Sequence, residues 1–340
     1  CALPIWIWAV LAGVAGGLGF LSKYAMLFAV AGVIVYLAWT PAARSARMLA
    51  RLAVAAAIAS VIALPNVLWN IDNGFATVRH TAELAQLEGP SSAWSLAEFL
   101  ANQIGIFGIV LSAALAWRAA AWRREPGDDR EKLLLAFSLP VLLAMIGQSV
   151  VAQAYGNWAA VAYVPLTLVV VGWLLRRGRH RWLLASVSLH LGLAAVALGA
   201  IAGDTLSRAR GGCGFAVLDR HLGWDIAGSD LAERLHANPD LTLISDDREV
   251  LAPLIYYARL EPGYYVKWRP SPVPDDHYAY RARLTTLNTG PWVLPSLHGE
   301  PADILTRFRT ARSMGRLTVP LSVCRARAIN YYELDEFQGY

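Results

Sequence analysis

The chain has 340 residues, 56% of them hydrophobic, and a mean hydropathy of +0.41. These values are typical of an integral membrane protein and exclude an ordinary soluble globular domain. The formal net charge of +5 could suggest nucleic acid as a partner, but the basic residues form short clusters between apolar segments. We therefore expect no nucleic-acid partner and take the basic clusters as topology signals.

The two parts of the chain differ in composition. Residues 1–203 hold 8 of the 25 acidic residues and 10 of the 13 tryptophans, whereas residues 204–340 hold 17 acidic residues and 16 of the 30 Lys and Arg. This predicts a membrane domain over 1–203 and a small soluble domain over 204–340. The chain opens on Cys1 and an apolar stretch with no charged segment before it, so we expect a truncated start and not a signal peptide.

Helices account for the apolar runs, because a helix of about 20 residues crosses a bilayer core of about 30 Å. The first run, from Leu3 to Trp39, is about twice that length, so we expect two helices that turn at Ser22 and Lys23. We predict an α-helical polytopic domain of about seven spans. They lie near 4–21, 24–40, 52–68, 96–117, 133–151, 158–175 and 182–203.

The connections between these spans alternate in charge. One side carries only Lys23 and Arg79, and the other carries twelve basic residues. The positive-inside rule makes the second side cytoplasmic, so the turn at 22–24, the loops 69–95 and 152–157 and everything after 203 are expected outside. The twelve are Arg44, Arg47, Arg51, Arg118, Arg123, Arg124, Arg130, Lys132, Arg176, Arg177, Arg179 and Arg181.

From residue 204 the pattern changes to short alternating elements, which predict an extracytoplasmic α/β domain. Asp246 with Glu249 fits a variant of the helix capping box, which we favour over a metal or nucleotide-sugar site. Cys213 and Cys324 lie near the two ends of the domain, where we expect a disulfide, and no Cys/His spacing resembles a metal site. Strands are expected at 241–245, 263–268, 291–297 and within 315–337, and helices at 246–260 and 301–311.

Ionisable side chains are nearly absent from the predicted span interiors, where a charge is costly and persists for a function. His190 is the one ionisable side chain deep in a predicted helix. A proton- or sodium-driven transporter is therefore disfavoured. For His190 we favour a packed, hydrogen-bonded histidine over a proton relay.

Polar side chains collect instead at the outer ends of the spans. Such a belt can be plain interfacial anchoring, because Trp and Tyr favour that depth and lysine snorkels. Several short loops contribute amides and cations at one level, which favours a site for a lipid phosphate. The belt consists of Lys23, Tyr24, Asn66, Trp69, Asn70, Asp72, Asn73, Arg79, His80, Gln153, Tyr155, Asn157 and Trp158.

Four phrases carry a family resemblance: "GLGFLSKYAMLFAVAGVIVYL" (17–37), "LPNVLWNIDNGFATVRHTAE" (64–83), "QAYGNWAAVAYVP" (153–165) and "GWD…LISDDREVLAPLIYYA" (223–258). In this order they resemble bacterial membrane glycosyltransferases of the GT-C class, family 39, the protein-mannosyltransferase-like set with the aminoarabinose transferases that act on lipid A. The resemblance covers nearly the whole chain, without the first helices of the family. It implies an inner-membrane enzyme that passes a sugar from a polyprenyl-phosphate carrier to a lipid, glycan or protein acceptor on the outer face.

The same resemblance implies the site. The family's catalytic base is an aspartate in the first outer loop, and no acid here matches it, so the catalytic residue is unknown and expected upstream of this segment. Lys23 matches the family's turn of a small residue plus lysine and is expected to bind the donor phosphate, with Arg79 as a second cation. No cofactor is expected, and a divalent metal stays open. The implied substrate pocket holds Tyr24, Asn70, His80, Tyr155, Asn157 and Trp158.

A second class of function stays open beside the enzyme. The chain could be a non-enzymatic membrane protein, either a lipid flippase or an envelope-assembly scaffold with an extracytoplasmic binding domain. A flippase should show a polar path through its helices, whereas polarity here gathers at one face. Lys23 would then only snorkel to the interface.

Overall fold

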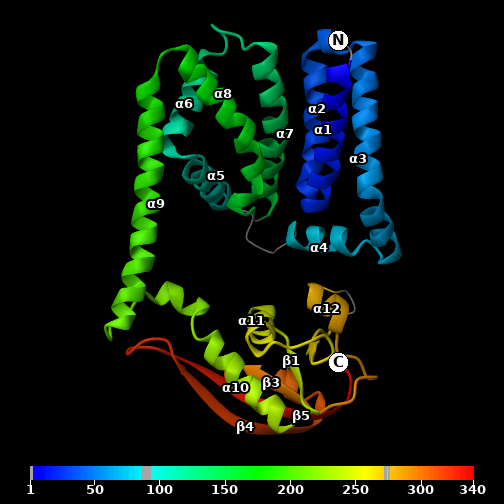
Figure 1. The fold of residues 1–340 in the computed structure, drawn as a ribbon, viewed down its shortest axis with the longest axis vertical. Coiled ribbons are helices and arrows are strands. Elements are labelled where there is room, and N and C mark those ends of the chain that lie inside the picture. The colour runs from blue at the N-terminus through cyan, green and yellow to red at the C-terminus, as the bar shows by residue number, and fades with distance from the viewer. Residues whose placement is uncertain (1–2, 86–92, 153, 272–273, 275) are drawn as a thin grey trace. The chain divides into compact units, whose positions relative to one another are not determined.

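The computed structural model describes residues 3–85, 93–152, 154–271, 274 and 276–340. The chain forms two compact units, Cys1–Ala194 and Ala195–Tyr340, and the boundary lies within one long helix, α9 (His180–Ala209). The first unit is helical, and the second contains a β-sheet (Figure 1). Each unit is described by itself.

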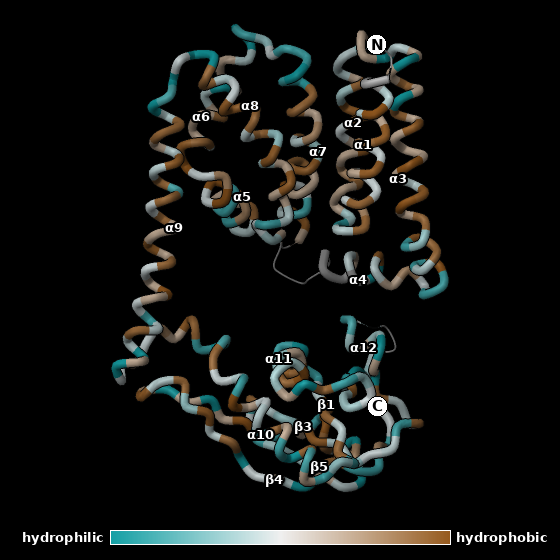
Figure 2. Tube along the Cα trace, viewed as in Figure 1, coloured by the Kyte–Doolittle hydropathy of each residue, from teal (hydrophilic) through white to brown (hydrophobic). Residues whose placement is uncertain are grey.

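Hydrophobic residues predominate along the long helices of the first unit (Figure 2). Among the described residues, four helical segments are long and apolar enough to cross a membrane: Ala46–Asp72, Asp129–Val151, Gly156–Arg176 and His180–Ala209. Two shorter apolar helices precede them, and the break between these two falls at Lys23. The elements are α1 (Leu3–Ser22), η1 (Tyr24–Met26), α2 (Leu27–Trp39), η2 (Pro41–Ala43), α3 (Ala46–Asp72), α4 (Ala76–Ala85), α5 (Ala93–Phe107), α6 (Ile109–Ala121), α7 (Asp129–Val151), η3 (Gly156–Ala162) and α8 (Tyr163–Arg176).

The segment 96–117, predicted as one span, is instead two helices that meet at a bend of 105°. Gly108 lies at the bend between α5 and α6 with φ +89°, a value that glycine adopts without strain. The ring of His190 from α9 approaches so closely that a Cβ on Gly108 would lie 2.4 Å from its Cε1 atom. The prediction of one continuous helix is therefore wrong here. His190 Nδ1 also donates to the carbonyl of Ser186 at 2.7 Å, as a packed histidine does.

Glycines let α1 and α3 approach closely. A Cβ on Gly13 would lie 2.6 Å from the carbonyl oxygen of Ala55, and one on Gly17 would lie 2.7 Å from Cβ of Ile62. A Cβ on Gly16 would have more space, because the nearest atom, Cβ of Ala59, would lie 3.6 Å away. Small residues four apart are a common way for apolar helices to pack when no hydrophobic effect drives them together.

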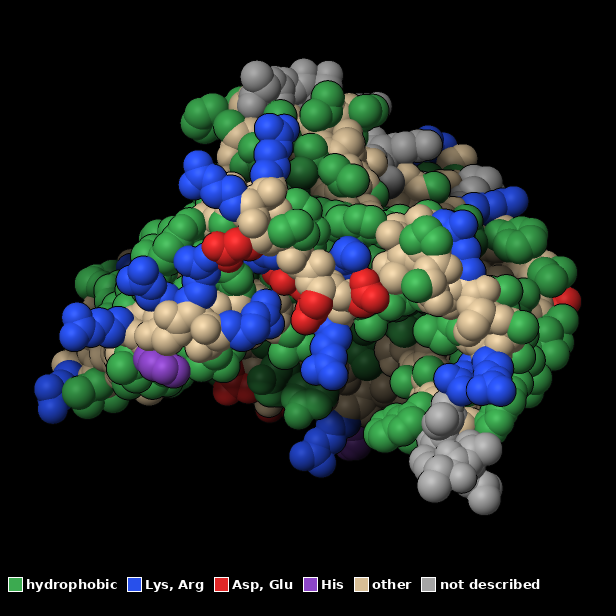
Figure 3. All heavy atoms as spheres, turned by 90° about the horizontal axis from the view of Figure 1, so that it is seen from above, with side chains coloured by type: hydrophobic (Ala, Val, Ile, Leu, Met, Phe, Trp, Pro, Cys, Tyr) green, Lys and Arg blue, Asp and Glu red, His purple; other side chains and the backbone are tan. Residues whose placement is uncertain are grey.

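Arginine and lysine side chains gather at the end of the helical unit that is seen from above in Figure 3. This end carries the α2–α3, α6–α7 and α8–α9 connections (Figure 1). Arg118 of α6 pairs there with Glu131 of α7 at 2.5 Å, and both side chains are only 4% exposed. Removing either partner would leave a buried charge, so the pair fixes how α6 lies against α7.

The second unit is built on a five-stranded sheet with the order β2-β1-β3-β5-β4. Strand β1 pairs in parallel with β2 and β3, whereas β5 runs antiparallel to β3 and β4. One apolar core contains Leu231, Leu251 and Tyr331, and a second contains Trp292 and Leu334. The elements are η4 (Ala216–His221), α10 (Trp224–Ala237), β1 (Thr242–Ser245), α11 (Arg248–Ala258), β2 (Tyr265–Lys267), α12 (His277–Ala282), β3 (Trp292–Ser296), α13 (Ala302–Leu305), β4 (Phe308–Pro320) and β5 (Ala326–Phe337).

Two local predictions for this unit are wrong. The helix expected over 301–311 ends at Leu305, and strand β4 begins at Phe308 because it pairs with β5 over most of its length. The cap of α11 is Asp247, whose carboxylate accepts from the amide of Glu249 at 2.7 Å, and not Asp246. The helix itself forms where the sequence places it.

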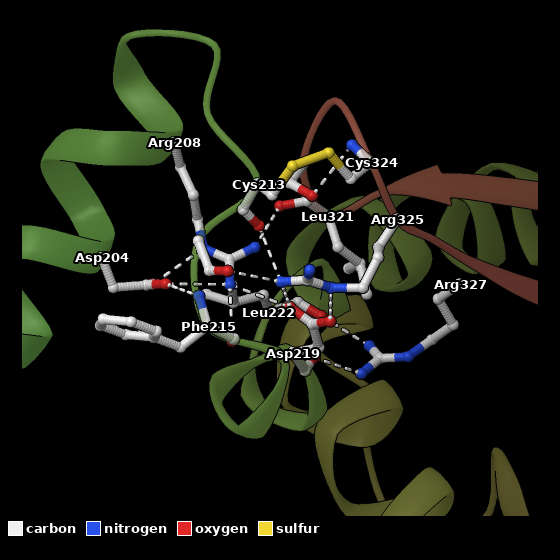
Figure 4. A network of polar contacts seen from close by, with 12 residues as sticks. Asp204, Arg208, Cys213, Phe215, Asp219, Leu222, Leu321, Cys324, Arg325 and Arg327 are labelled. Atoms are coloured by element: carbon white, nitrogen blue, oxygen red, sulfur yellow. Dashed lines mark hydrogen bonds and ion pairs between the residues drawn. A yellow bond between two sulfur atoms is a disulfide. The ribbon is translucent and has the colours of Figure 1, made fainter.

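Asp219 of η4 joins the end of α9 to the sheet (Figure 4). Its carboxylate accepts from Arg208 of α9 at 2.9 Å and from Arg325 beside β5. Its backbone carbonyl accepts from Arg327 of β5 at 2.8 Å. These hydrogen bonds involve charged groups, which makes them stronger than neutral ones.

A disulfide between Cys213 and Cys324 closes the same junction. Arg325 donates to the carbonyl of Cys213 at 2.7 Å, and Arg208 donates to the carbonyl of Leu321 at 2.7 Å. The segment that follows α9 is therefore fixed to the β4–β5 hairpin by one covalent bond and several ionic hydrogen bonds.

The packing of α1 on α3 predicts opposite outcomes for two neighbouring glycines. Gly13→Ala should destabilise the protein by about 1–3 kcal/mol, because the new methyl group meets backbone. Gly16→Ala should be neutral or stabilising by up to about 1 kcal/mol, because alanine favours a helix more than glycine does. Thermal unfolding of both variants in the same detergent checks this, and equal melting temperatures would contradict the close α1–α3 contact.

The Asp219 network predicts a dependence of stability on pH. The hydrogen bonds from Arg325 and Arg208 hold the pKa of the Asp219 carboxyl below its ordinary value of 3.8. A lowered pKa stabilises the fold above pH 3.8, and this stabilisation is lost as the pH falls through the folded-state pKa. Asp219→Asn should therefore be less stable at neutral pH and lose less stability below pH 3.8.

Melting temperatures of the full chain across acidic and neutral pH measure this effect. Asp225→Asn is the matched control, since Asp225 is an exposed acid of the same unit whose carboxylate has no ion pair among the described residues. If the Asp219 variant followed the pH profile of the wild type, the network would not be the source of the acid sensitivity.

Candidate functional site

Three connections lie at the end of the helical unit opposite to the basic clusters (Figure 1). They are the turn between α1 and α2, the passage from α3 to α4, and the link from α7 to α8. The residues proposed from the sequence as a phosphate and sugar site belong to these three connections. The structure therefore brings the three segments to one level of the helical unit.

Tyr24 forms a polar cluster with the end of α3. Its hydroxyl donates to Oδ1 of Asn66 at 2.7 Å and accepts from Nδ2 of Asn70 at 2.9 Å, while its ring stacks on Phe20 at 4.7 Å. Asn70 is 5% exposed, and its Oδ1 accepts from the amide of Thr77 in α4 at 3.2 Å. The cluster thus holds the α1–α2 turn against both α3 and α4. A pocket role for Tyr24 and Asn70 stays a prediction, since their polar atoms bond within this cluster.

Lys23 lies at the turn that this cluster fixes. Its backbone is extended, with φ −160° and ψ 129°, its amide donates to Gly19 at 2.9 Å and its carbonyl accepts from Met26 at 3.0 Å. The side chain is exposed, and the ammonium group forms no hydrogen bond or ion pair with any residue that the structure describes. A positively charged group is therefore available on a well-defined backbone.

Arg79 of α4 is a second available cation. It follows a tight turn in which Gly74 and Phe75 both have positive φ, +61° and +58°. Its guanidinium lies over Gly74, where a Cβ would be 3.8 Å from Nη1, and it has no hydrogen-bond or ion-pair partner among the described residues. Two further predicted groups, the side chain of His80 and all of Gln153, lie outside the described residues.

Gln103 of α5 positions the third connection and was not singled out as a site residue from the sequence. It is 9% exposed and donates to the carbonyl of Gly156 at 3.1 Å, while its own carbonyl accepts from the hydroxyl of Tyr163. The amide thereby ties η3 to α5. In the sequence it is one of several polar residues of α5, beside Glu98 and Asn102, so no pattern singles it out.

Tyr155, Asn157 and Trp158 lie on this connection, where the rings of Tyr155 and Trp158 are 5.3 Å apart. The side chains of Tyr155 and Asn157 are exposed, and their polar atoms have no hydrogen-bond partner among the described residues. Within the same described part of the chain, no hydrogen bond, ion pair or ring contact joins them to Lys23, Tyr24, Asn70 or Arg79. The two groups share a level but form no polar or ring contact with each other in the described part of the chain.

The arrangement suits an anion. Ammonium and guanidinium groups with free donors favour a phosphate dianion, and neither Lys23 nor Arg79 is paired with a described acid. Over the described ranges, no three His, Cys, Asp or Glu side chains are grouped so that they could hold a metal ion.

One known protein is similar to this chain over most of its length. The chain is 35% identical over 288 residues to the lipid A galacturonosyltransferase RgtD of Rhizobium johnstonii. The resemblance to membrane glycosyltransferases is confirmed. The matched region covers 83% of the chain, which is more than either unit contains, so the similarity extends over residues of both units.

The chain spans 59% of the length of that galacturonosyltransferase. No protein-family model and no solved structure matches the chain. The similarity therefore rests on this relative, and activity, substrates and partners are treated below as proposals.

The Tyr24 cluster predicts a stability difference between two tyrosines. Tyr24→Phe should cost about 1 kcal/mol, because it keeps the ring but removes the hydrogen bonds of the hydroxyl to Asn66 and Asn70, whose side chains then bond only to each other and to backbone. Tyr155→Phe should be close to neutral, since the Tyr155 hydroxyl has no partner among the described residues. Chemical denaturation in detergent measures both, and a neutral Tyr24→Phe would show that the cluster does not fix the turn.

Proposed function

We propose that this chain is part of a membrane glycosyltransferase that moves a sugar from a polyprenyl-phosphate carrier to a lipid, glycan or protein acceptor. The observation that carries the proposal is the exposed ammonium of Lys23, unpaired among the described residues, on a turn held by partly buried hydrogen bonds. The similar protein is a lipid A galacturonosyltransferase. For this chain, the similarity favours an acidic sugar as the sugar of the donor and lipid A as the acceptor.

The proposed reaction is a displacement at the anomeric carbon of the donor sugar. The acceptor oxygen forms a bond to this carbon while the bond from the carbon to the phosphate oxygen breaks. A general base takes the proton of the acceptor hydroxyl, and the polyprenyl phosphate leaves with the electron pair. Lys23 and Arg79 stabilise the negative charge that grows on the phosphate. The base is assigned to the outer loop that the family resemblance puts ahead of these helices.

The proposed orientation follows from charge. The basic end of the helical unit faces the cytoplasm of a bacterial inner membrane, so the end with Lys23 faces outward. The α/β unit is then extracytoplasmic, where the disulfide between Cys213 and Cys324 can persist. Tyr155, Asn157 and Trp158 are proposed to line the sugar or acceptor pocket, since their side chains present polar atoms and aromatic surface at the same level.

A flippase or an assembly scaffold is the rival function. A flippase needs polar groups along the helices, whereas the available cations described above lie at one end of the helical unit. A scaffold needs no phosphate site at all. Binding of the carrier and transfer of the sugar therefore have to be measured separately.

Substitution of Lys23 tests the enzyme proposal. In the full-length protein reconstituted in vesicles, Lys23→Ala should lower kcat/KM about 100-fold, the typical cost of one donor that stabilises developing charge. Lys23→Arg should keep part of the activity because it keeps the charge. The measurement is transfer of galacturonic acid from its polyprenyl phosphate to lipid A.

Ser22→Ala is the control, since Ser22 is exposed beside Lys23 and bonds only to its own helix through the carbonyl of Leu18. Near-normal turnover of Lys23→Ala would remove Lys23 from the site. If the wild type binds polyprenyl phosphate, Lys23→Ala does not, and no sugar is transferred to any offered acceptor, the result would support a flippase in place of the enzyme.

A further inference from the structure

The apolar stretch of α9 ends abruptly at Asp204. Between Trp182 and Gly203 the helix has no Asp, Glu, Lys or Arg. These residues rise about 33 Å, slightly more than the bilayer core of about 30 Å. Since α9 is long and apolar enough to cross a membrane, Asp204 marks the level at which it leaves the hydrocarbon.

The segment after α9 folds back to this level. The amide of Phe215 donates to the carboxylate of Asp204, and the carbonyl of Phe215 accepts from Arg208 at 2.9 Å. Both backbone polar groups of Phe215 are thus bonded to side chains of α9. Phe215 therefore lies at the height of Asp204, beside the end of the crossing helix.

This segment presents apolar side chains outward. Phe215 is 51% exposed and Val217 is 75% exposed, whereas Asp219 points inward to the guanidinium groups. Figure 4 shows the ring of Phe215 directed away from Asp219 and Arg325. The disulfide and the ionic hydrogen bonds fix the backbone of the segment. Its apolar side chains therefore cannot become buried in the protein by a rearrangement of the segment.

We propose that residues 213–221 are an interfacial membrane anchor, in which Phe215 and Val217 enter the boundary of the lipid bilayer beside α9. Aromatic and aliphatic side chains on a segment with basic neighbours favour this depth, where the basic groups reach lipid phosphates. Arg210 precedes the segment and Arg220 lies near its end, and both are exposed. The anchor requires only that α9 crosses a membrane and does not depend on the transferase activity.

Spin labelling of the full chain in vesicles tests the anchor. A nitroxide is attached at Val217→Cys in a Cys1→Ser background, and the vesicles contain phosphatidylethanolamine and phosphatidylglycerol. The control is Leu287→Cys, an even more exposed apolar position of the same unit at 90%. Power saturation compares accessibility to oxygen, which concentrates in lipid, with accessibility to a water-soluble nickel chelate.

We expect a ratio of oxygen to nickel accessibility that is several-fold higher at Val217 than at Leu287. A label at Ala216, also exposed, should give the same result if the Val217 variant fails to fold. Equal, water-like ratios at both positions would overturn the anchor. Protection of Val217 from both reagents would also overturn it, because protein and not lipid would then cover the segment.

Discussion

The cost of placing a charge in hydrocarbon governs this fold. A charged side chain at the centre of a bilayer costs about 2.5–3.5 kcal/mol or more, so charges lie at helix ends or in pairs. Lys23 lies at the break between α1 and α2, and Asp204 lies where the apolar part of α9 ends. The buried pair of Arg118 and Glu131 lies near the basic end, where each charge neutralises the other. The same constraint therefore sets the helix lengths and the position of the candidate site.

This constraint explains which parts of the fold could be predicted from the sequence. Hydropathy places the long helices and the turn at Lys23, because both depend on residues that are neighbours in the chain. The bend lies at Gly108, against the ring of His190, which is distant in sequence, and hydropathy alone does not reveal it. Strand β4 likewise replaces the last residues of a predicted helix, because β5, which follows it, supplies its hydrogen-bond partners. Local propensity fails where a contact from another segment decides the structure.

For the candidate site, the sequence predicts which residue types are present and that they lie at the same end of the helices. It does not predict the hydrogen bonds between them. Tyr24, Asn70 and Tyr155 look alike in sequence as polar groups at helix ends. The structure separates them, since Tyr24 and Asn70 bond to each other while the hydroxyl of Tyr155 has no partner among the described residues. Gln103 could not be ranked from sequence, because its importance lies in its hydrogen bonds to the carbonyl of Gly156 and from the hydroxyl of Tyr163.

The two proposed surfaces, the phosphate site at Lys23 and the membrane anchor at Phe215, are stabilised in the same way. The backbone of exposed Lys23 is held by the partly buried hydrogen bond between Tyr24 and Asn70, and that of exposed Phe215 by the ionic cluster around Asp219. A side chain on an unsupported loop would lose conformational entropy when it meets a lipid, at a cost of about 1–2 kcal/mol for each backbone residue that is ordered. Here folding has already ordered the backbone through buried polar contacts. Binding of a phosphate or of a bilayer surface therefore has to immobilise little more than the side chains themselves.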